Sequence, residues 1–267
     1  MAVRHGVHMD GLQTVDTIQR SSGRSPAQPR PFRVVPNIAP YAHGSVLVST
    51  GNTQVICAVS AEDVIPRWMK EQNVSGGWIT AEYSMLPYST LTRRPRDVAK
   101  GKLDGRGVEI QRLIGRALRA AVDLELLGPR TLWIDCDVLQ ADGGTRTAAI
   151  SGASIAVALA FSKLLAAGTL QQLPLRRLVA ATSVGIVDGK VLVDLDYEED
   201  KRASVDLNLV MSHRGELIEV QGAGEEATFS TSELSDMLSA GQQAIGSIFE
   251  HQKQILRTLE PQLPEIQ

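Results

Sequence analysis

Five stretches of the chain have apolar and polar positions in patterns typical of β-strands: most contain apolar-rich runs, and residues 131–140 alternate. Three of these stretches are long enough for two strands, with Gly51 and Asn52, Asp188 and Gly189, or Arg214 and Gly215 near the middle. Because such pairs favour tight turns, these three stretches predict antiparallel hairpins. The five stretches are residues 44–60, 78–86, 131–140, 178–195 and 203–222.

Three other segments predict helices. Apolar residues recur at helical spacing in 108–128, where a Gly-Pro pair predicts the end of the helix. Residues 147–168 are apolar almost throughout and include many small side chains, which favours a closely packed core helix. Ser230 and Glu233 have the spacing of a capping box, so a long helix is expected to follow them.

The order of these elements predicts an α+β fold, with mixed sheets, packed helices and two similar halves. The folded domain is expected to span residues 32–260. Residues 1–31 are rich in Gly, Ser and Pro without any period, which predicts an irregular N-terminal arm unless it docks on the domain. Residues 261–267 are expected to form a short C-terminal tail.

Composition indicates the cellular compartment of the protein. The chain has 267 residues, and 43% of them are hydrophobic, which is enough for a substantial core. Cys57 and Cys136 each lie in a strand-like stretch, so both are interpreted as small buried residues in a reducing compartment. We find no run of about 18 apolar residues that would predict a membrane span, and no signal-peptide pattern. The protein is therefore expected in the cytoplasm, away from membranes.

The formal charge of −3 hides an uneven distribution. Residues 93–119 contain nine Lys or Arg against three acidic residues, and residues 188–200 contain six acidic residues against one lysine. A basic cluster attracts a polyphosphate backbone, with an affinity that falls as salt rises. A solvated loop paired with the acidic stretch is the alternative. The cluster comprises Arg93, Arg94, Arg96, Lys100, Lys102 and Arg106.

The stretch ADGGTRT lies between a predicted strand and a predicted helix. Gly143 and Gly144 would let the backbone approach a ligand, and the free N–H groups of the first helical turn would favour an anion. Thr145 can add a hydroxyl donor, and Arg146 a fork of donors that matches phosphate oxygens. The stretch thus predicts a phosphate-sized anion site. A glycine-rich turn followed by a solvated arginine is the alternative.

Five carboxylates fall within residues 194–200, and Asp206 follows inside an apolar strand. A carboxylate in such a strand indicates a polar face or a site. Magnesium prefers oxygen ligands and keeps several waters, so one or two carboxylates suffice to hold it. Glu198 and Glu199 are expected in a solvated loop, and a charged surface hairpin is the alternative for the whole stretch.

An anion site, a basic strip and a carboxylate pair together suggest phosphoryl transfer on a nucleic acid. The five scattered histidines form no convincing catalytic arrangement with serine or cysteine. Two alternatives remain. A hydrolytic nuclease would release monophosphates without using inorganic phosphate, and a non-catalytic RNA-binding subunit would keep the basic strip without the other features.

Four long motifs carry a resemblance to a known family. They are GRGVEIQRLIGRALRA, WIDCDVLQADGGTRTAAISGA, DLDYEEDKRASVDLNLVM and GGWITAEYSMLP. Over residues 32–258 the chain resembles the ribonuclease PH family. The resemblance implies the ribonuclease PH-like fold and phosphate-dependent trimming of tRNA 3′ ends, which releases nucleoside diphosphates reversibly. It also implies a homohexamer built as a trimer of dimers, with inorganic phosphate as co-substrate and a divalent cation, expected to be magnesium.

The same resemblance implies roles for individual residues. Phosphate binding is carried over to Arg106, Gly144, Thr145 and Arg146. Catalysis and metal binding are carried over to Asp200 and Asp206. RNA contacts are carried over to Arg93 and Arg96, and Tyr88 stands where the family commonly has arginine, so that it would stack on a base instead.

Overall fold

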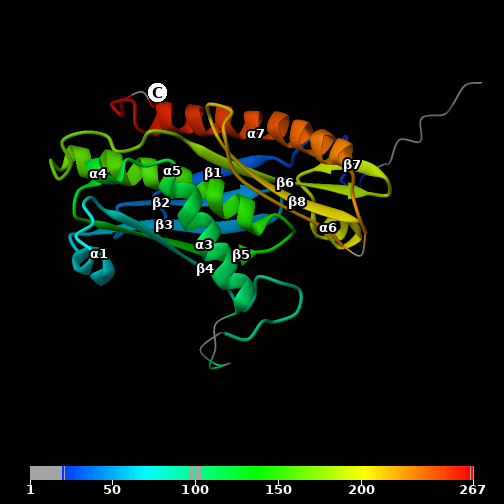
Figure 1. The fold of residues 1–267 in the computed structure, drawn as a ribbon, viewed down its shortest axis with the longest axis horizontal. Helices are drawn as coiled ribbons and strands as arrows, with labels where there is room; N and C mark the ends of the chain where they lie inside the picture. The colour runs from blue at the N-terminus through cyan, green and yellow to red at the C-terminus, as the bar shows by residue number, and fades with distance from the viewer. Residues whose placement is uncertain are drawn as a thin grey trace, which may run out of the picture.

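The computed structural model of this protein describes residues 20, 22–96, 99, 101, 104–225, 227–264 and 266. Figure 1 shows two β-sheets with helices packed against them. This arrangement confirms the predicted α+β class with mixed sheets.

The first sheet has the strand order β1-β2-β3-β5-β4. All neighbouring strands are antiparallel except β4 and β5, which are parallel. The carboxyl ends of β4 and β5 therefore meet at one edge of the sheet. Two segments leave the sheet there: the loop after β4 that carries the basic cluster, called the basic loop below, and the glycine-rich turn after β5. The strands are β1 (Phe32–Pro36), β2 (Gly44–Thr50), β3 (Thr53–Glu62), β4 (Trp78–Met85) and β5 (Thr131–Gln140).

The second sheet has the strand order β7-β6-β8-β9 and is antiparallel throughout. Its two hairpins turn at Gly189 and near Gly215, as the sequence predicted. A short helix, α6 (Tyr197–Arg202), connects β7 to β8 and carries much of the acidic stretch. The strands are β6 (Val179–Val187), β7 (Lys190–Val193), β8 (Val205–Ser212) and β9 (Leu217–Gly224).

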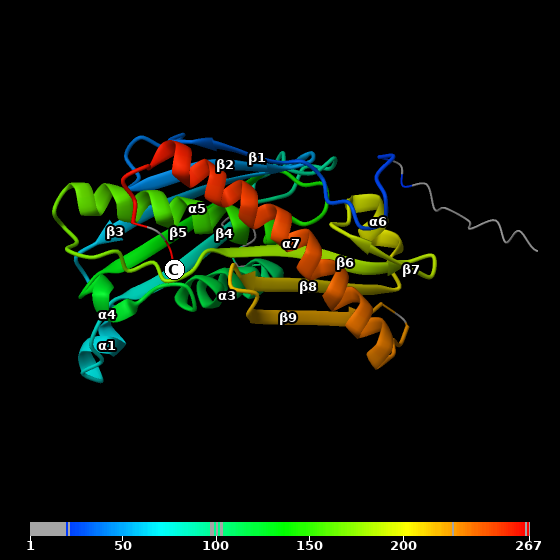
Figure 2. The same cartoon turned by 90° about the horizontal axis from the view of Figure 1, so that it is seen from above.

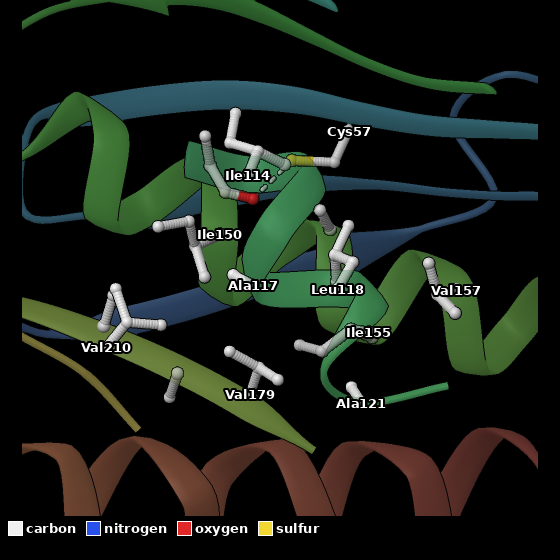
Figure 3. Packing of buried hydrophobic residues seen from close by; sticks show 14 of the residues in the cluster. Cys57, Ile114, Ala117, Leu118, Ala121, Ile150, Ile155, Val157, Val179 and Val210 are labelled. Carbon is white, nitrogen blue, oxygen red and sulfur yellow. Dashed lines mark hydrogen bonds between the residues drawn. The ribbon is translucent and has the colours of Figure 1, made fainter. Parts of the chain in front are cut away.

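The helix α5 (Thr145–Ala166) joins the two sheets, since it packs on β2 and β3 and also contacts β6. Ile114, Ile150 and Val179, from α3, α5 and β6, gather in one packed cluster (Figure 3). Among the described helices, α5 alone has the length and mean hydropathy, 1.8, of a membrane span. No such segment was predicted from the sequence, and 89% of this apolar window is buried inside the protein, as in a core helix.

Four more helices lie in the described part of the chain. Figure 2 shows α7 crossing the second sheet over β6 and β8. The capping box predicted at its start is present, because the Ser230 and Glu233 side chains each accept a hydrogen bond from the other's backbone N–H. Helix α3 packs against β4. The helices are α1 (Arg67–Glu71), α3 (Gly105–Arg119), α4 (Leu124–Leu127) and α7 (Thr231–Leu259).

The single helix predicted for residues 108–128 is wrong, because α3 ends at Arg119 and α4 is separate. The backbone carbonyl of Ala121 accepts hydrogen bonds from the N–H groups of Arg176 and Arg177, and Val122 bridges to Leu175. Asp123 then caps α4. A distant segment thus pairs with this backbone and interrupts a helix that local spacing alone would continue.

The residues just before β1 dock on the acidic stretch through three buried arginines. Arg20 Nη2 lies 2.6 Å from Glu199 Oε2, and Arg30 Nη2 lies 2.7 Å from Asp194 Oδ1. Arg24 contacts both carboxylates at longer range. Glu199 was expected in a solvated loop, but it is 2% exposed within α6 because it pairs with Arg20. That partner is 179 residues away.

The Arg30–Asp194 pair predicts an acid-sensitive stability. Burial opposes ionisation of Asp194, but the hydrogen bonds and charge of Arg30 lower its pKa below the usual value. A lowered folded-state pKa gives stability that is present above about pH 4 and lost as pH falls through the folded-state value. Asp194→Asn is therefore expected to lower the free energy of unfolding by about 3 to 5 kcal/mol at neutral pH, since it leaves Arg30 buried and unpaired. Urea unfolding measures this loss, and the gap to wild type should narrow below about pH 4.

The matched control is Glu71→Gln, which breaks the exposed Arg67–Glu71 pair. It should cost less than about 1 kcal/mol at any pH. A loss for Asp194→Asn that stayed constant down to strongly acidic pH would contradict the assigned role of its charge.

Candidate active site

A left-handed turn connects β5 to α5. Gly143 and Gly144 have φ of 73° and 64°, a conformation that disfavours side chains. A Cβ on Gly143 would also lie 2.5 Å from the carbonyl oxygen of Leu195. Leu195 belongs to residues 194–200, the acidic segment that leads from β7 through α6, which we call the acidic connection. Both the conformation and the close approach require glycine here. The turn therefore rests directly on the segment that leads into α6.

Protein donors satisfy the carbonyl groups of this turn. Arg30 Nη1 donates to the carbonyl of Asp142, and Thr53 Oγ1 donates to the carbonyl of Gly143 at 2.6 Å. Gly144 is the N-cap of α5 and provides no side-chain cap. The first N–H groups of α5 thus lack intrahelical partners, as an anion site at a helix start requires.

Thr145 and Arg146 begin α5 at this point. Thr145 is 7% exposed, and its Oγ1 accepts a hydrogen bond from the Tyr83 hydroxyl at 2.7 Å. Arg146 is partly buried, with Nη1 at 3.3 Å from Gln221 Oε1 and 3.5 Å from Glu109 Oε1. No local pattern in the chain indicated these three partners, because each lies on a separate element.

Arg106 is the second residue of α3 and is exposed. Burial raises the pKa of Asp200 and of Tyr83, and the charges of Arg106 and Arg146 oppose the rise in both groups. The structure thus brings Arg106, Thr145 and Arg146 to one place around Tyr83, although Arg106 precedes the turn by almost forty residues.

Asp200 and Asp206 lie close enough to influence each other. Burial raises the pKa of Asp206 to about 6, with a further contribution from the Asp200 charge, whereas Arg146 and the Asn208 amide oppose the rise. Burial of its carboxyl also raises the pKa of Asp200. Asp206 Oδ1 is buried and has no hydrogen-bond partner among the described residues. An unpaired carboxylate oxygen facing a second carboxylate is poised for a cation.

These two carboxylates fit magnesium. Within the described parts of the chain, no three His, Cys, Asp or Glu side chains form a ready-made metal site. Magnesium does not require one, because it keeps several waters and is commonly held by one or two carboxylates together with substrate phosphates.

The basic loop is only partly assembled at the site. Arg96 and Arg106 line a cleft of about 390 Å³, whose wall also carries Glu82, Asp135 and Asp137. Arg93 and Tyr88 are exposed and are not among the residues that line it. Arg94 pairs with Asp104 at 3.3 Å. The predicted cluster members Lys100 and Lys102 lie outside the described residues.

The acidic wall of this cleft was not predicted. Glu82, Asp135 and Asp137 come from the neighbouring strands β4 and β5, in which they alternate with buried residues. Burial raises the pKa of Asp135 and of Asp137, and Glu82 adds to both shifts. Arg96 opposes the shift at Asp137, which places its charge near this wall.

Comparison with known proteins agrees with this geometry. The sequence model of the 3′ exoribonuclease family, domain 1, matches residues 28–162, and that of domain 2 matches residues 177–244. The chain belongs to the 3′ exoribonuclease family. The exoribonuclease is 51% identical over 238 residues to ribonuclease PH of Bacillus mycoides (strain KBAB4), a match that covers 89% of this chain and 96% of that protein.

A second relative gives the same result. Ribonuclease PH of Bacillus cereus (strain AH187) is 50% identical over 238 residues, covering 89% of this chain and 96% of that protein. The expected activity is thereby confirmed: this exoribonuclease is phosphorolytic, a tRNA nucleotidyltransferase that processes tRNA with inorganic phosphate as co-substrate.

Solved structures share the fold. Rice (Oryza sativa) Rrp46 has a TM-score of 0.70 at 23% identity, covering 89% of this chain and 100% of that one. The Archaeoglobus fulgidus exosome with RNA bound to the active site has a TM-score of 0.76 at 23% identity, covering 88% of this chain and 92% of that one. These likenesses confirm the ribonuclease PH-like arrangement of the two sheets.

Gly143→Ala tests how the turn is held. An alanine here would have to adopt a left-handed conformation, and its Cβ would collide with the carbonyl of Leu195. Thermal or urea unfolding should show a loss of more than about 3 kcal/mol, beyond the roughly 1 to 3 kcal/mol of a left-handed alanine alone.

Gly189→Ala is the matched control, because Gly189 has φ of 74° but a Cβ added to it would meet no atom within 4 Å. It should show only the conformational cost, about 1 to 3 kcal/mol. Equal losses in the two variants would mean that the turn does not press on the acidic connection.

Proposed function

We propose that Arg106, Gly144, Thr145 and Arg146 bind the attacking orthophosphate. The observation that carries the proposal is the convergence of both arginine charges on Tyr83 and Asp200 beside the uncapped start of α5. Two fixed cations and a helix start offset the repulsion between an incoming phosphate and the RNA backbone.

In the proposed reaction, an oxygen of bound orthophosphate attacks the phosphorus of the last phosphodiester. The bond from that phosphorus to the 3′ oxygen of the preceding nucleotide breaks, and that oxygen takes a proton. A nucleoside diphosphate leaves, and the RNA is one nucleotide shorter. One phosphodiester is exchanged for one diphosphate of comparable energy, so the reaction runs in both directions.

Asp200 and Asp206 are proposed as the residues that hold the divalent cation, with magnesium the expected ion. When bound, the cation would supply electrostatic stabilisation of the charge that develops on the scissile phosphate. One of the two carboxylates is alternatively proposed to handle the proton that the leaving 3′ oxygen takes. Burial raises the pKa of Asp206 to about 6, which suits a group that delivers this proton.

Arg93, Arg96 and Tyr88 are proposed to contact RNA. Arg93 and Tyr88 are exposed on the loop that leaves β4, and Tyr88 is 67% exposed, which suits stacking on a base. Because β4 and β5 are parallel, this loop leaves the same sheet edge as the phosphate turn.

We further propose a cytoplasmic homohexamer, arranged as a trimer of dimers. Val35, Leu47, Ile56 and Trp133 lie on the strand faces opposite the buried side of the first sheet and are partly or largely exposed in the single chain. Burial of such a face between chains is favourable. The sulfurs of the free cysteines Cys57 and Cys136 lie only 3.9 Å apart, which supports a reducing compartment.

Arg146→Ala tests the phosphate site. Loss of a preorganised charged donor typically removes about 3 to 4 kcal/mol of transition-state stabilisation, or roughly a hundredfold or more in rate. Release of nucleoside diphosphates from a tRNA precursor should fall by this factor, while Arg67→Ala, at an exposed residue of α1, should leave the rate unchanged.

The same assay without orthophosphate separates the candidate activities. Wild-type protein should then leave the RNA intact, because the nucleophile is missing. Undiminished shortening of RNA with release of monophosphates would identify a hydrolytic nuclease and contradict the proposed site.

Asp206→Asn tests the cation site. The variant should need at least about tenfold more magnesium for half-maximal activity, since one of two charged ligands is lost. Magnesium should also raise the unfolding temperature of wild-type protein more than that of the variant, because an ion that binds the folded state stabilises it. Glu198→Gln, at an exposed residue of α6, the helix that carries Asp200, is the control. An unchanged magnesium requirement would remove Asp206 from the site.

A further inference from the structure

Tyr83 lies at the centre of the proposed phosphate site. Its side chain points from β4 into the core and is 6% exposed, and its hydroxyl reaches Thr145 Oγ1 at 2.7 Å. Its backbone carbonyl is the nearest contact of Gly107, one residue after Arg106, at 3.7 Å from a Cβ placed there. One residue thus touches the starts of both helices that carry the phosphate-binding arginines.

The Tyr83 hydroxyl is neutral and acts as a donor. Burial raises its pKa above the usual value, although the charges of Arg106 and Arg146 oppose the rise. A buried tyrosine hydroxyl needs a partner, and Thr145 supplies it.

The hydroxyl of Thr145 has one proton and two lone pairs. One lone pair accepts the proton of Tyr83. Among the described residues, Thr145 Oγ1 has no hydrogen-bond partner besides Tyr83, even though this side chain is buried. A buried donor that lacks an acceptor in the protein, located at an anion site, is suited to donate to the anion.

We infer that Tyr83 is a positioning residue for orthophosphate: by donating to Thr145 Oγ1, it fixes the Thr145 hydroxyl with its proton directed at a phosphate oxygen. The inference rests on the proposed phosphate site and deepens it. It also explains why a strand residue with no contact to RNA ends in a polar group at this position, where phenylalanine would fill the same space.

Tyr83→Phe removes only the hydroxyl oxygen. Without it the Thr145 hydroxyl is free to rotate, and the loss of one neutral hydrogen bond corresponds to about a three- to tenfold change in affinity. The KM for orthophosphate should rise by this factor. The KM for tRNA and the kcat at saturating phosphate should change less than twofold, a division that a general loss of stability would not produce.

A double-mutant cycle with Thr145→Val makes the test specific. In the Thr145→Val background, Tyr83→Phe should have no further effect on the KM for orthophosphate, because its target hydroxyl is gone. An equal rise in both backgrounds, or a rise in the KM for tRNA instead, would overturn the inference.

Two further variants provide controls. Thr131→Val removes another mostly buried hydroxyl, bonded to the Val64 carbonyl at the opposite end of β5, and should not change the KM for orthophosphate. Thr145→Ser restores the hydroxyl that Thr145→Val lacks, so it should recover most of the affinity for orthophosphate that Thr145→Val loses. If Tyr83→Phe does not fold, a wild-type KM for orthophosphate in Thr145→Val still overturns the inference.

A failure of the proposed function would give a different result from a failure of this inference. If wild-type protein shortens tRNA equally with and without orthophosphate, the phosphate site itself is wrong. If wild type depends on orthophosphate but Tyr83→Phe leaves the KM for orthophosphate unchanged, the proposed phosphate site is retained and the role of Tyr83 is rejected.

Discussion

The site depends on one constraint: the left-handed turn at Gly143 and Gly144 must rest against the backbone that leads into α6. The Cβ that glycine lacks would lie 2.5 Å from the carbonyl of Leu195, so the two segments are in direct backbone contact. Arg30 closes the arrangement from a third side, because it binds the Asp142 carbonyl and the Asp194 carboxylate together. The position of the phosphate turn relative to Asp200 is thereby fixed by rigid backbone rather than by side chains alone.

The buried arginines before β1 are better explained by this geometry than by stability. Burying a charged pair costs desolvation energy that the attraction between the charges often only offsets, and apolar residues of similar size would serve stability as well. Apolar residues could not fix the orientation of α6. Arg20 and Arg30 bind two different points of the acidic connection, at Glu199 and Asp194, and so determine how α6 presents Asp200.

Features governed by local sequence were predictable, and features governed by distant pairing were not. The hairpin turns, the glycine turn and every described strand except β1 follow from apolar stretches and from residues that tolerate unusual φ. Residues 32–36, which form β1, carried no strand prediction. The interruption between α3 and α4 does not, because it arises when Ala121 and Val122 pair with residues 175–177. Glu199 looked solvated since its partner, Arg20, is 179 residues away. Tyr83 looked like an ordinary core residue because its one polar contact comes from another element. The convergence of Arg106, Arg146 and Asp200 came from family resemblance, and spacing along the chain could not have given it.

The structural arginines Arg20 and Arg30 differ from Arg146, and the difference explains how the proposed site can be both rigid and open to substrate. Structural arginines make short contacts with buried carboxylates, 2.6 Å for Arg20 and 2.7 Å for Arg30. Arg146 makes longer contacts, 3.3 Å to the Gln221 amide and 3.5 Å to the partly exposed Glu109. A phosphate with several oxygens in bidentate reach competes well against such partners and poorly against the structural ones. On the acidic side, Asp206 likewise keeps one buried oxygen without a partner among the described residues. In the proposed site, Arg146 thus has only long contacts and Asp206 keeps one unpartnered oxygen, and these are the groups that substrate phosphate and a cation are proposed to complete.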